Sequence, residues 1–293
     1  MEEDVNKPED EGEEFEEIEM DTNNPIIVFC FMFMEYVKEI DPDMYKKAHK
    51  YAQDHTDLDI TDFEIDFVTK INGSEFDGHM TIGEIGEEWG RGKLGYNSEI
   101  MMFGCNPNFH KIGNYNKKYD LDLILQASFY NHPARLKGYN IILQSAKKLF
   151  KIGKRMNVYG AFWDQPEGEK LLENIPYKGF HDNSDIPDIC ASSKIILGVQ
   201  CSDTSKTQQS MRAFEVLASR GFHLTQYVES MDYWFENGKH LIAVKNKDEA
   251  YDKMKYYLKN DTERNKIALQ GYEYVINNHT YVHRVKESIL PNI

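Results

Sequence analysis

Short apolar segments alternate with helix-forming segments through the second half of the chain. The apolar segments have the length of buried strands and fall at residues 121–127, 156–159, 175–177, 194–200, 222–226 and 242–244. Segments with helical periodicity or with helix-start and helix-stop residues lie between and after them, at residues 139–152, 187–192, 210–220, 248–259, 262–278 and 281–289. Because strands that alternate with helices need crossover connections, the pattern predicts a doubly wound α/β domain with a parallel sheet.

The first half of the chain has fewer such segments. An apolar run at residues 26–34, an alternating apolar and acidic run at 63–68 and a short run at 99–103 predict three strands. A helix is predicted over residues 41–54, and the glycine-rich residues 71–97 predict loops with a short hairpin. This part is therefore expected to be a reduced α/β domain.

Charge divides the chain unevenly. The net charge is −15, but residues 1–21 alone carry twelve acids and one lysine, and the other 272 residues carry 37 acids and 33 bases. A segment with so few apolar residues buries too little surface to offset the entropy of ordering it. We expect a disordered acidic tail over residues 1–24, the reduced domain over 25–118 and the doubly wound domain over 119–293. The alternative is a tail that mimics nucleic acid or screens a basic cleft.

The chain lacks the sequence signals of a membrane protein, a metal site or a common cofactor site. No stretch approaches the roughly 18 apolar residues that a spanning helix needs. The four cysteines have neither C-x-x-C nor zinc-finger spacing: Cys30, Cys105, Cys190 and Cys201. The G-x-G-x-x-G, P-loop, H-E-x-x-H and G-x-S-x-G motifs are missing. We expect a soluble, cytoplasmic protein with reduced thiols, no metal and no resident cofactor.

Candidate chemistry lies where a predicted strand leads through a polar loop into a helix, at residues 194–226. The N-terminus of such a helix carries free N–H groups and binds anions. Arg212 lies in the first turn and Glu215 one turn later on the same face. A cation beside a diphosphate and a carboxylate facing ribose hydroxyls would suit a nucleotide sugar. The alternative is an exposed ion pair worth a few tenths of a kcal/mol.

Several motifs together resemble one family. They are MRAFEVLASRG at residues 211–221, WFENG at 234–238, NHTY at 278–281 followed by Arg284, FGCNPNF at 103–109, YG at 159–160 and YKGF at 177–180. This combination, over roughly residues 100–290, resembles the CgeB-like (spore-maturation-type) glycosyltransferases.

The resemblance implies a GT-B architecture, in which two Rossmann-like domains face each other and a nucleotide-diphosphate sugar lies mainly on the C-terminal one. Residues 25–118 would be the acceptor-side domain. Glu215 would bind the ribose, and three basic side chains would face the diphosphate: Arg135, Lys137 and Arg212. The base pocket would be lined by Tyr159, Gly160, Gly179 and Phe180. The donor would be a UDP- or GDP-linked sugar, and the acceptor a glycan, a protein or DNA.

The chain departs from the family pattern at two positions. Thr207 stands eight residues before Glu215, where retaining GT-B enzymes often have a glutamate that contacts the donor sugar, and His240 stands where an acid is usual. The catalytic base is unassigned. Candidates in the first part of the chain rest on residue type alone: His49, His55, Asp77 and His79.

Two other functions fit the sequence. One is an inactive nucleotide- or glycan-binding module that keeps the fold without catalysis. The other is a DNA-modifying transferase, for which a basic cluster would contact phosphates: Lys147, Lys148, Lys151, Lys154 and Arg155. Such clusters are more often solvated helix faces.

The charge arithmetic makes a prediction about the tail. Deleting residues 1–21 should leave the thermal unfolding of the rest unchanged, since the tail has little apolar surface to bury. Hydrogen exchange on the full chain measures this directly. Strong amide protection within residues 1–21 would contradict the prediction.

Overall fold

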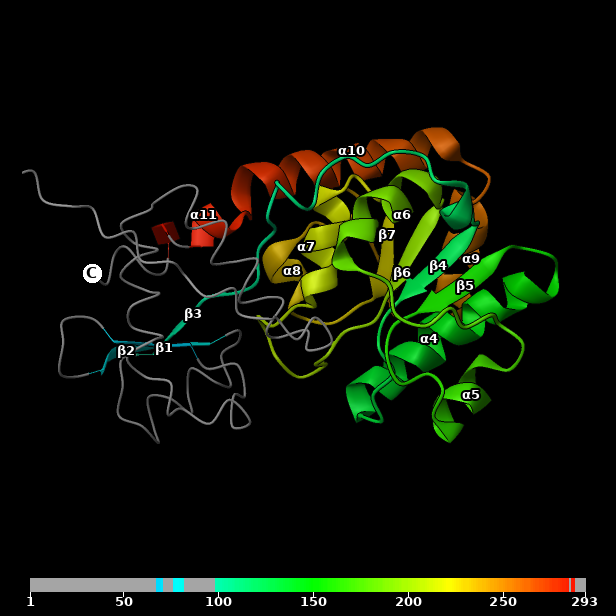
Figure 1. Cartoon of the computed structure of the whole chain (residues 1–293), viewed down its shortest axis with the longest axis horizontal. Helices are drawn as coiled ribbons and strands as arrows, with labels where there is room; N and C mark the ends of the chain where they lie inside the picture. The colour runs from blue at the N-terminus through cyan, green and yellow to red at the C-terminus, as the bar shows by residue number, and fades with distance from the viewer. Residues whose placement is uncertain (1–66, 71–75, 82–97, 285, 288–293) are drawn as a thin grey trace, which may run out of the picture.

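The computed structural model of the 293-residue chain describes residues 67–70, 76–81, 98–284 and 286–287 (Figure 1). The predicted tail, the predicted strand at 26–34 and the predicted helix at 41–54 lie outside the described residues, as do His49 and His55. Within the described ranges, no helix combines the length and the apolar character that crossing a membrane requires.

A small mixed sheet comes first, in the order β1-β2-β3. β1 (Phe67–Lys70) pairs antiparallel with β2 (Phe76–Thr81), and β2 pairs parallel with β3 (Ser98–Ile100). β1 and β3 overlap two of the predicted strands, and the β1–β2 pairing forms a hairpin. The domain boundary at residue 118 stays a prediction.

The second sheet has five parallel strands in the order β5-β4-β6-β7-β8. The strands are β4 (Leu123–Gln126), β5 (Met156–Tyr159), β6 (Ile195–Gly198), β7 (His223–Gln226) and β8 (Ile242–Val244). An isolated parallel bridge joins Val158 to Tyr177, where the predicted extended segment at 175–177 lies. The prediction of a doubly wound α/β domain is confirmed.

Helices cover both faces of this sheet (Figure 1). One layer contains α4 (Pro133–Lys151), α5 (Pro166–Leu172) and α9 (Lys247–Tyr257), and the other contains α6 (Ile186–Ser192), α7 (Met211–Ala218) and α10 (Asp261–Asn278). Two short helices complete the domain: α8 (Met231–Trp234) and α11 (Tyr281–Arg284).

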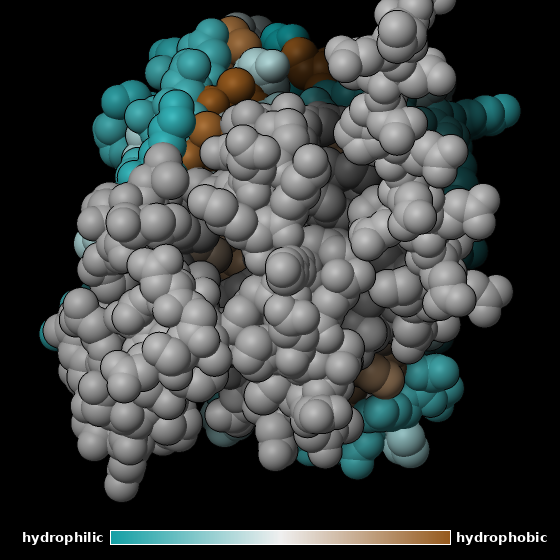
Figure 2. Space-filling view, turned by 60° about the vertical axis from the view of Figure 1, so that its left-hand side comes forward, coloured by the Kyte–Doolittle hydropathy of each residue, from teal (hydrophilic) through white to brown (hydrophobic). Residues whose placement is uncertain are grey.

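The two faces follow from the alternation of side chains along each strand. In β4, Leu123 and Leu125 belong to the core under α4 and α9, whereas Ile124 packs with α6 and with Val216 of α7. All four residues of β4 are buried, as expected for a central parallel strand. Where described residues are visible on the surface in Figure 2, most are hydrophilic, with small hydrophobic patches between them.

Three local predictions were wrong. α4 begins at Pro133 rather than at residue 139, because proline is favoured in the first turn of a helix and Gly138 is tolerated inside it. A side chain at Gly138 would collide with Gln226, since an added Cβ would lie 1.7 Å from its Oε1. Helices α5 and α8 were missed, because segments of seven and four residues show too few turns for periodicity.

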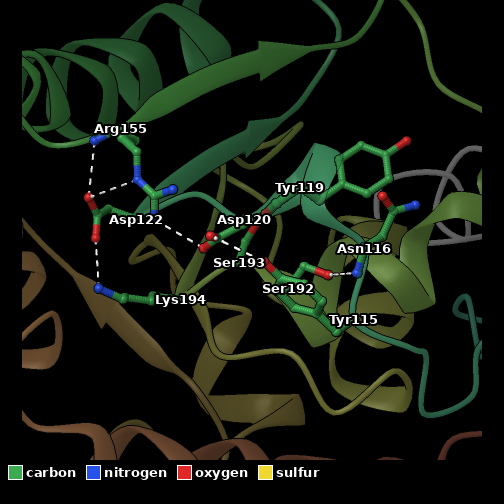
Figure 3. A network of polar contacts seen from close by, with 9 residues as sticks. All are labelled: Tyr115, Asn116, Tyr119, Asp120, Asp122, Arg155, Ser192, Ser193 and Lys194. Atoms are coloured by element: carbon green, nitrogen blue, oxygen red, sulfur yellow. Dashed lines mark hydrogen bonds and ion pairs between the residues drawn. The ribbon is translucent and has the colours of Figure 1, made fainter.

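A network of polar contacts closes the amino edge of the sheet (Figure 3). Asp122, Arg155 and Lys194 stand directly before β4, β5 and β6. Asp122 Oδ1 lies 2.8 Å from Lys194 Nζ, and Asp122 Oδ2 accepts a hydrogen bond from the Arg155 backbone N–H at 3.1 Å. Arg155 Nη2 also pairs with Asp120 Oδ1 at 3.0 Å.

The same edge fixes the chain that precedes β4 (Figure 3). The Asn116 backbone N–H donates to Ser192 Oγ at 2.8 Å, and Ser193 Oγ donates to the Tyr119 carbonyl at 2.6 Å. An added Cβ at Gly113 would lie 2.1 Å from the Pro187 backbone. The segment leading into β4 is therefore packed against α6, and the amino edge has no room for a ligand at these positions.

We predict that Asp122→Asn lowers the free energy of unfolding by about 1.5–3 kcal/mol at pH 7, the range for hydrogen bonds to charged groups. Burial raises the pKa of Asp122, but the hydrogen bonds from Lys194 and Arg155 outweigh it and hold the pKa below 3.8. The stabilisation is therefore complete above pH 3.8 and is lost as the pH falls through the lowered pKa.

Urea unfolding of the two proteins at pH 7 and pH 3 measures this difference. Asp120→Asn is the matched control, because Asp120 is half-exposed and should change stability less. Equal stability of the parent and Asp122→Asn at pH 7 would contradict the prediction.

Candidate functional site

The order of the strands reverses between β4 and β6, and open α/β sheets bind ligands at the carboxyl ends of the strands at this point. Gln126 ends β4 and Gln226 ends β7, and both side chains are almost completely buried. Gln200 follows β6; its Oε1 accepts the Ser210 backbone N–H at 2.9 Å and its Nε2 donates to Thr225 Oγ1 at 3.2 Å. Gln200 therefore fixes the start of α7 at this edge.

In the Arg212–Glu215 pair on α7 the carboxylate is buried and the guanidinium is partly buried. The side chain of Glu215 is 2% exposed and that of Arg212 is 22% exposed, and Arg212 Nη1 lies 2.8 Å from Glu215 Oε2. Neither of these two atoms makes a hydrogen bond of normal geometry with any described residue. The simple surface pair that sequence alone allowed is therefore excluded, because the Glu215 carboxylate is held in an ion pair inside the domain.

A histidine that sequence reasoning missed faces the same carboxylate. His110 is 2% exposed, and its Nε2 lies 3.7 Å from Glu215 Oε1. Its Nδ1 accepts the Asn106 backbone N–H at 3.2 Å, so the proton of the neutral ring is on Nε2. Burial, with a contribution from Arg212, lowers the pKa of His110 despite the opposing Glu215 charge. The motif FGCNPNF ends one residue before His110, which was the signal available.

The C-terminal motif holds this segment in place. We call residues 279–284 the C-terminal clasp. Cys105 donates its backbone N–H to the His279 carbonyl at 2.9 Å and accepts that of Tyr281 at 3.0 Å. Arg284 Nε donates to the Phe103 carbonyl at 3.1 Å, while its Nη2 donates to His279 Nδ1 at 2.9 Å. The clasp therefore fixes residues 103–110 against α7.

Tyr159 and Gly160 lie at the end of β5, and Gly179 and Phe180 follow the extended segment at residues 175–177. The four predicted base-pocket residues differ in exposure. Phe180 is 59% exposed and stacks on His181, with ring centroids 6.1 Å apart. His181 Nδ1 lies 2.8 Å from the Asp182 carbonyl and therefore donates to it, which leaves Nε2 to accept from Gln126 Nε2 at 3.1 Å. Burial lowers the pKa of His181 to about 4, and Arg212 contributes. Tyr159 is buried with the core.

The backbone at residues 160 and 179 has positive φ angles, which glycine adopts most easily. Gly160 has φ +137°, and an added Cβ would lie 2.3 Å from the Ala127 carbonyl oxygen. Its N–H donates to the Gly179 carbonyl at 3.1 Å. Gly179 has φ +73° and open space around its α-carbon. The role of the four residues in base binding stays a prediction.

Arg135 and Lys137 lie in the first turns of α4, not in a loop as predicted, because the helix begins at Pro133. Arg135 Nη2 donates to Cys201 Sγ at 3.0 Å, and Lys137 Nζ pairs with Asp203 Oδ2 at 3.0 Å. Both side chains therefore reach the loop that leads from β6 to α7. They stand at the same edge of the sheet as Arg212, because α4 and α7 both start at the carboxyl ends of strands.

A sequence profile of the family described as glycosyl transferase-like matches residues 135–289, more than half of the chain. The chain belongs to this glycosyl transferase-like family. None of the curated proteins compared with the sequence matches it. The matched residues include α4, α7 and the C-terminal clasp, so the family-matched segment contains the Arg212–Glu215 pair.

Solved structures of GT-B-type glycosyltransferases resemble the fold. A glycosyltransferase from Rickettsia africae superposes with a TM-score of 0.54 at 15% identity, covering 73% of this chain and 62% of the other. HepE from Anabaena, in complex with UDP and glucose, gives 0.55 at 11% identity, covering 71% and 60%. Sucrose-phosphate synthase from Thermosynechococcus elongatus gives 0.53 at 10% identity, covering 73% and 57%. The chain thus spans about three-fifths of these proteins' lengths.

Two other features of this glycosyl transferase-like chain lie away from the pair. A surface cavity of about 530 Å³ is lined by α8, by the following turn and by Tyr274, and contains none of the predicted donor-binding residues. His240, at the position where an acid is usual in the resembling family, stacks on Tyr274 there at 3.9 Å. The predicted donor-binding residues therefore lie at the carboxyl edge of the sheet and not in this cavity.

Most residues of the basic cluster on and after α4 form ion pairs. Lys147 is 5% exposed and pairs with Glu173 at 3.0 Å, and Lys151 reaches the same carboxylate at 3.5 Å. Lys148 pairs with Asp248 at 3.9 Å. Arg155 belongs to the amino-edge network. Lys148 and Lys151 stay more than half exposed, so the cluster keeps positive charge at the surface.

The two glycines allow a prediction about stability. Gly160→Ala should destabilise the fold by roughly 2–4 kcal/mol, because it combines a disfavoured φ with a backbone collision. Gly179→Ala should cost only about 1–2 kcal/mol, the penalty for a left-handed residue in open space. Chemical denaturation of both variants gives the comparison, and equal losses would show that Gly160 is not sterically constrained.

Proposed function

We propose that the chain is a glycosyltransferase that binds a UDP- or GDP-linked sugar at the carboxyl edge of the five-stranded sheet and transfers the sugar to an acceptor. The observation that carries the proposal is the ion pair of Arg212 with a Glu215 carboxylate that is 2% exposed, at the carboxyl edge where open α/β sheets bind ligands. Family membership supports the reaction class.

The unused hydrogen-bonding capacity points to a ligand. A buried polar atom without a partner costs about 1–3 kcal/mol, and more when it is charged, so proteins rarely keep one without a reason. Such atoms include His110 Nε2, which faces Glu215 on α7, and Gln126 Oε1, at the end of β4. Ribose hydroxyls donate to a carboxylate, and phosphate oxygens accept from a guanidinium. One nucleotide would therefore satisfy both members of the pair.

The surroundings fit the diphosphate and the base. Neither α4 nor α7 has an acid in its first turn, so no carboxylate there would repel a diphosphate at the positive end of the helix. Arg135 and Lys137 add charge on the α4 side, and phosphate oxygens would compete with Cys201 and Asp203 for them. The exposed ring of Phe180 offers a face on which a base can stack.

The arrangement supports transfer chemistry at the donor. In the reaction an acceptor hydroxyl oxygen bonds to C1 of the sugar, the bond from C1 to the diphosphate breaks, and the hydroxyl proton passes to a base or to the departing diphosphate. Negative charge grows on the departing nucleoside diphosphate, and preorganised cations lower that barrier. Arg212, Arg135 and Lys137 would supply this charge. We further propose that the chain is a CgeB-like GT-B protein whose first 118 residues contain the acceptor side.

We predict that Glu215→Ala weakens UDP or GDP binding about 10- to 150-fold, the equivalent of 1.5–3 kcal/mol for hydrogen bonds to a charged group. Arg212→Ala should lower turnover more than ground-state binding, because it meets charge that develops as the diphosphate leaves. Isothermal titration with UDP and GDP, together with release of nucleotide from UDP-glucose and GDP-mannose, measures both effects.

Glu236→Ala is the matched control, because Glu236 forms an exposed pair with Lys239 at the same i, i+3 spacing. It should bind nucleotide as the parent does. The proposal is wrong if the parent binds neither UDP nor GDP, or if Glu215→Ala and Arg212→Ala bind as tightly as the parent. Binding without any release of nucleotide would favour an inactive module.

A further inference from the structure

We propose that His110 is a positioning residue for the donor site: its Nε2–H orients the Glu215 carboxylate toward the ribose hydroxyls, and residues 103–110 thereby form a wall of that site. This inference rests on the proposed function. It concerns a side chain outside the family-matched residues 135–289, about 100 positions from α7.

The contact between His110 and Asn106 decides the tautomer of the His110 ring. The ring nitrogen Nδ1 accepts the Asn106 backbone N–H at 3.2 Å, so it cannot also carry the proton of a neutral imidazole. The proton is therefore on Nε2, which makes no hydrogen bond with any described residue and lies 3.7 Å from Glu215 Oε1. A donor and a carboxylate oxygen thus face each other across a water-excluded gap slightly longer than a hydrogen bond.

The two oxygens of the Glu215 carboxylate have different neighbours. Arg212 lies at Oε2 and His110 lies at Oε1, so each oxygen of Glu215 has one positive or donating neighbour. A carboxylate held only by Arg212 could rotate about its last bond. The second donor restricts this rotation and fixes the lone pairs that ribose hydroxyls would meet.

The segment that carries His110 is held rigidly in place. His110 lies on a segment tied to the C-terminal clasp by the Cys105 hydrogen bonds and by Arg284 Nε on the Phe103 carbonyl. The Arg284 guanidinium also lies 4.9 Å from the centre of the Trp234 ring and 5.6 Å from that of Phe214, the neighbour of Glu215. One set of contacts therefore sets the distance between His110 and α7. A histidine that served only to fill space would not need a proton directed at a carboxylate.

Two substitutions separate the two ring nitrogens. His110→Asn can still accept the Asn106 N–H near the Nδ1 position but is too short to donate to Glu215. His110→Gln reaches the Nε2 position with an amide N–H. His240→Asn is the control for removing a buried histidine, since His240 is 7% exposed and lies at the cavity beside Tyr274.

The readout is discrimination for the ribose. The full-length parent and each variant are titrated with UDP and GDP and with their 2′,3′-dideoxy analogues, and thermal unfolding is recorded alongside. We expect His110→Asn to weaken binding of the ribonucleotide about threefold to tenfold, because the carboxylate loses the donor that restricts its rotation. Binding of the dideoxy analogue should be unchanged, so the preference for ribose shrinks. His110→Gln should retain most of the preference, and His240→Asn all of it.

The outcomes distinguish the two proposals. Suppose that the parent prefers the ribonucleotide and that Glu215→Gln loses this preference. If His110→Asn then keeps the preference, the role of His110 is overturned while the proposed function stands. Equal weakening of both nucleotides by His110→Asn also overturns it, because a purely structural role would act on both. If the parent has no ribose preference, or binds neither nucleotide, the assignment of Glu215 fails and that of His110 fails with it.

Discussion

Burying the Glu215 carboxylate to 2% exposure would cost several kcal/mol if positive charge and hydrogen-bond donors did not surround it. The fold supplies Arg212 from the same helix and His110 from a segment about 100 residues earlier. Arg212 Nη1 forms an ion pair with Oε2 at 2.8 Å, but His110 Nε2 stands 3.7 Å from Oε1, beyond hydrogen-bond distance, so part of the desolvation cost at Oε1 remains uncompensated. A ligand hydroxyl that donates to this carboxylate would recover that energy, which makes the site suited to binding.

Structural support for this site comes from both edges of the sheet. At the amino edge, Asp122 joins the strand starts through Arg155 and Lys194, and this fixes β4, β5 and β6 relative to one another (Figure 3). At the carboxyl edge, Gln200 fixes the start of α7. The amino edge is filled with its own salt bridges, whereas the carboxyl edge keeps unpartnered polar atoms. This asymmetry is what an α/β domain that binds its ligand at the strand ends requires.

The sequence predicted the elements whose signals are local. The bounds of β5 and β8 were correct, because each is a short apolar run between turn residues, and Arg212 and Glu215 were correctly placed on one helix face. The burial of that pair could not be predicted, because it depends on the C-terminal clasp bringing residues 103–110 over α7. His110 was missed for the same reason. The start of α4 was misjudged because Gly138 suggested a loop, whereas its real role is close packing against Gln226.

A crystal structure of the full chain soaked with UDP, or with GDP if that nucleotide binds more tightly, tests the central claim most directly. The account predicts the ribose O2′ and O3′ within about 2.5–3.0 Å of the Glu215 carboxylate oxygens, with the diphosphate at Arg212 and the first turn of α7. His110 Nε2 would remain beside Oε1. A bound nucleotide whose ribose contacts no atom of Glu215 would contradict it.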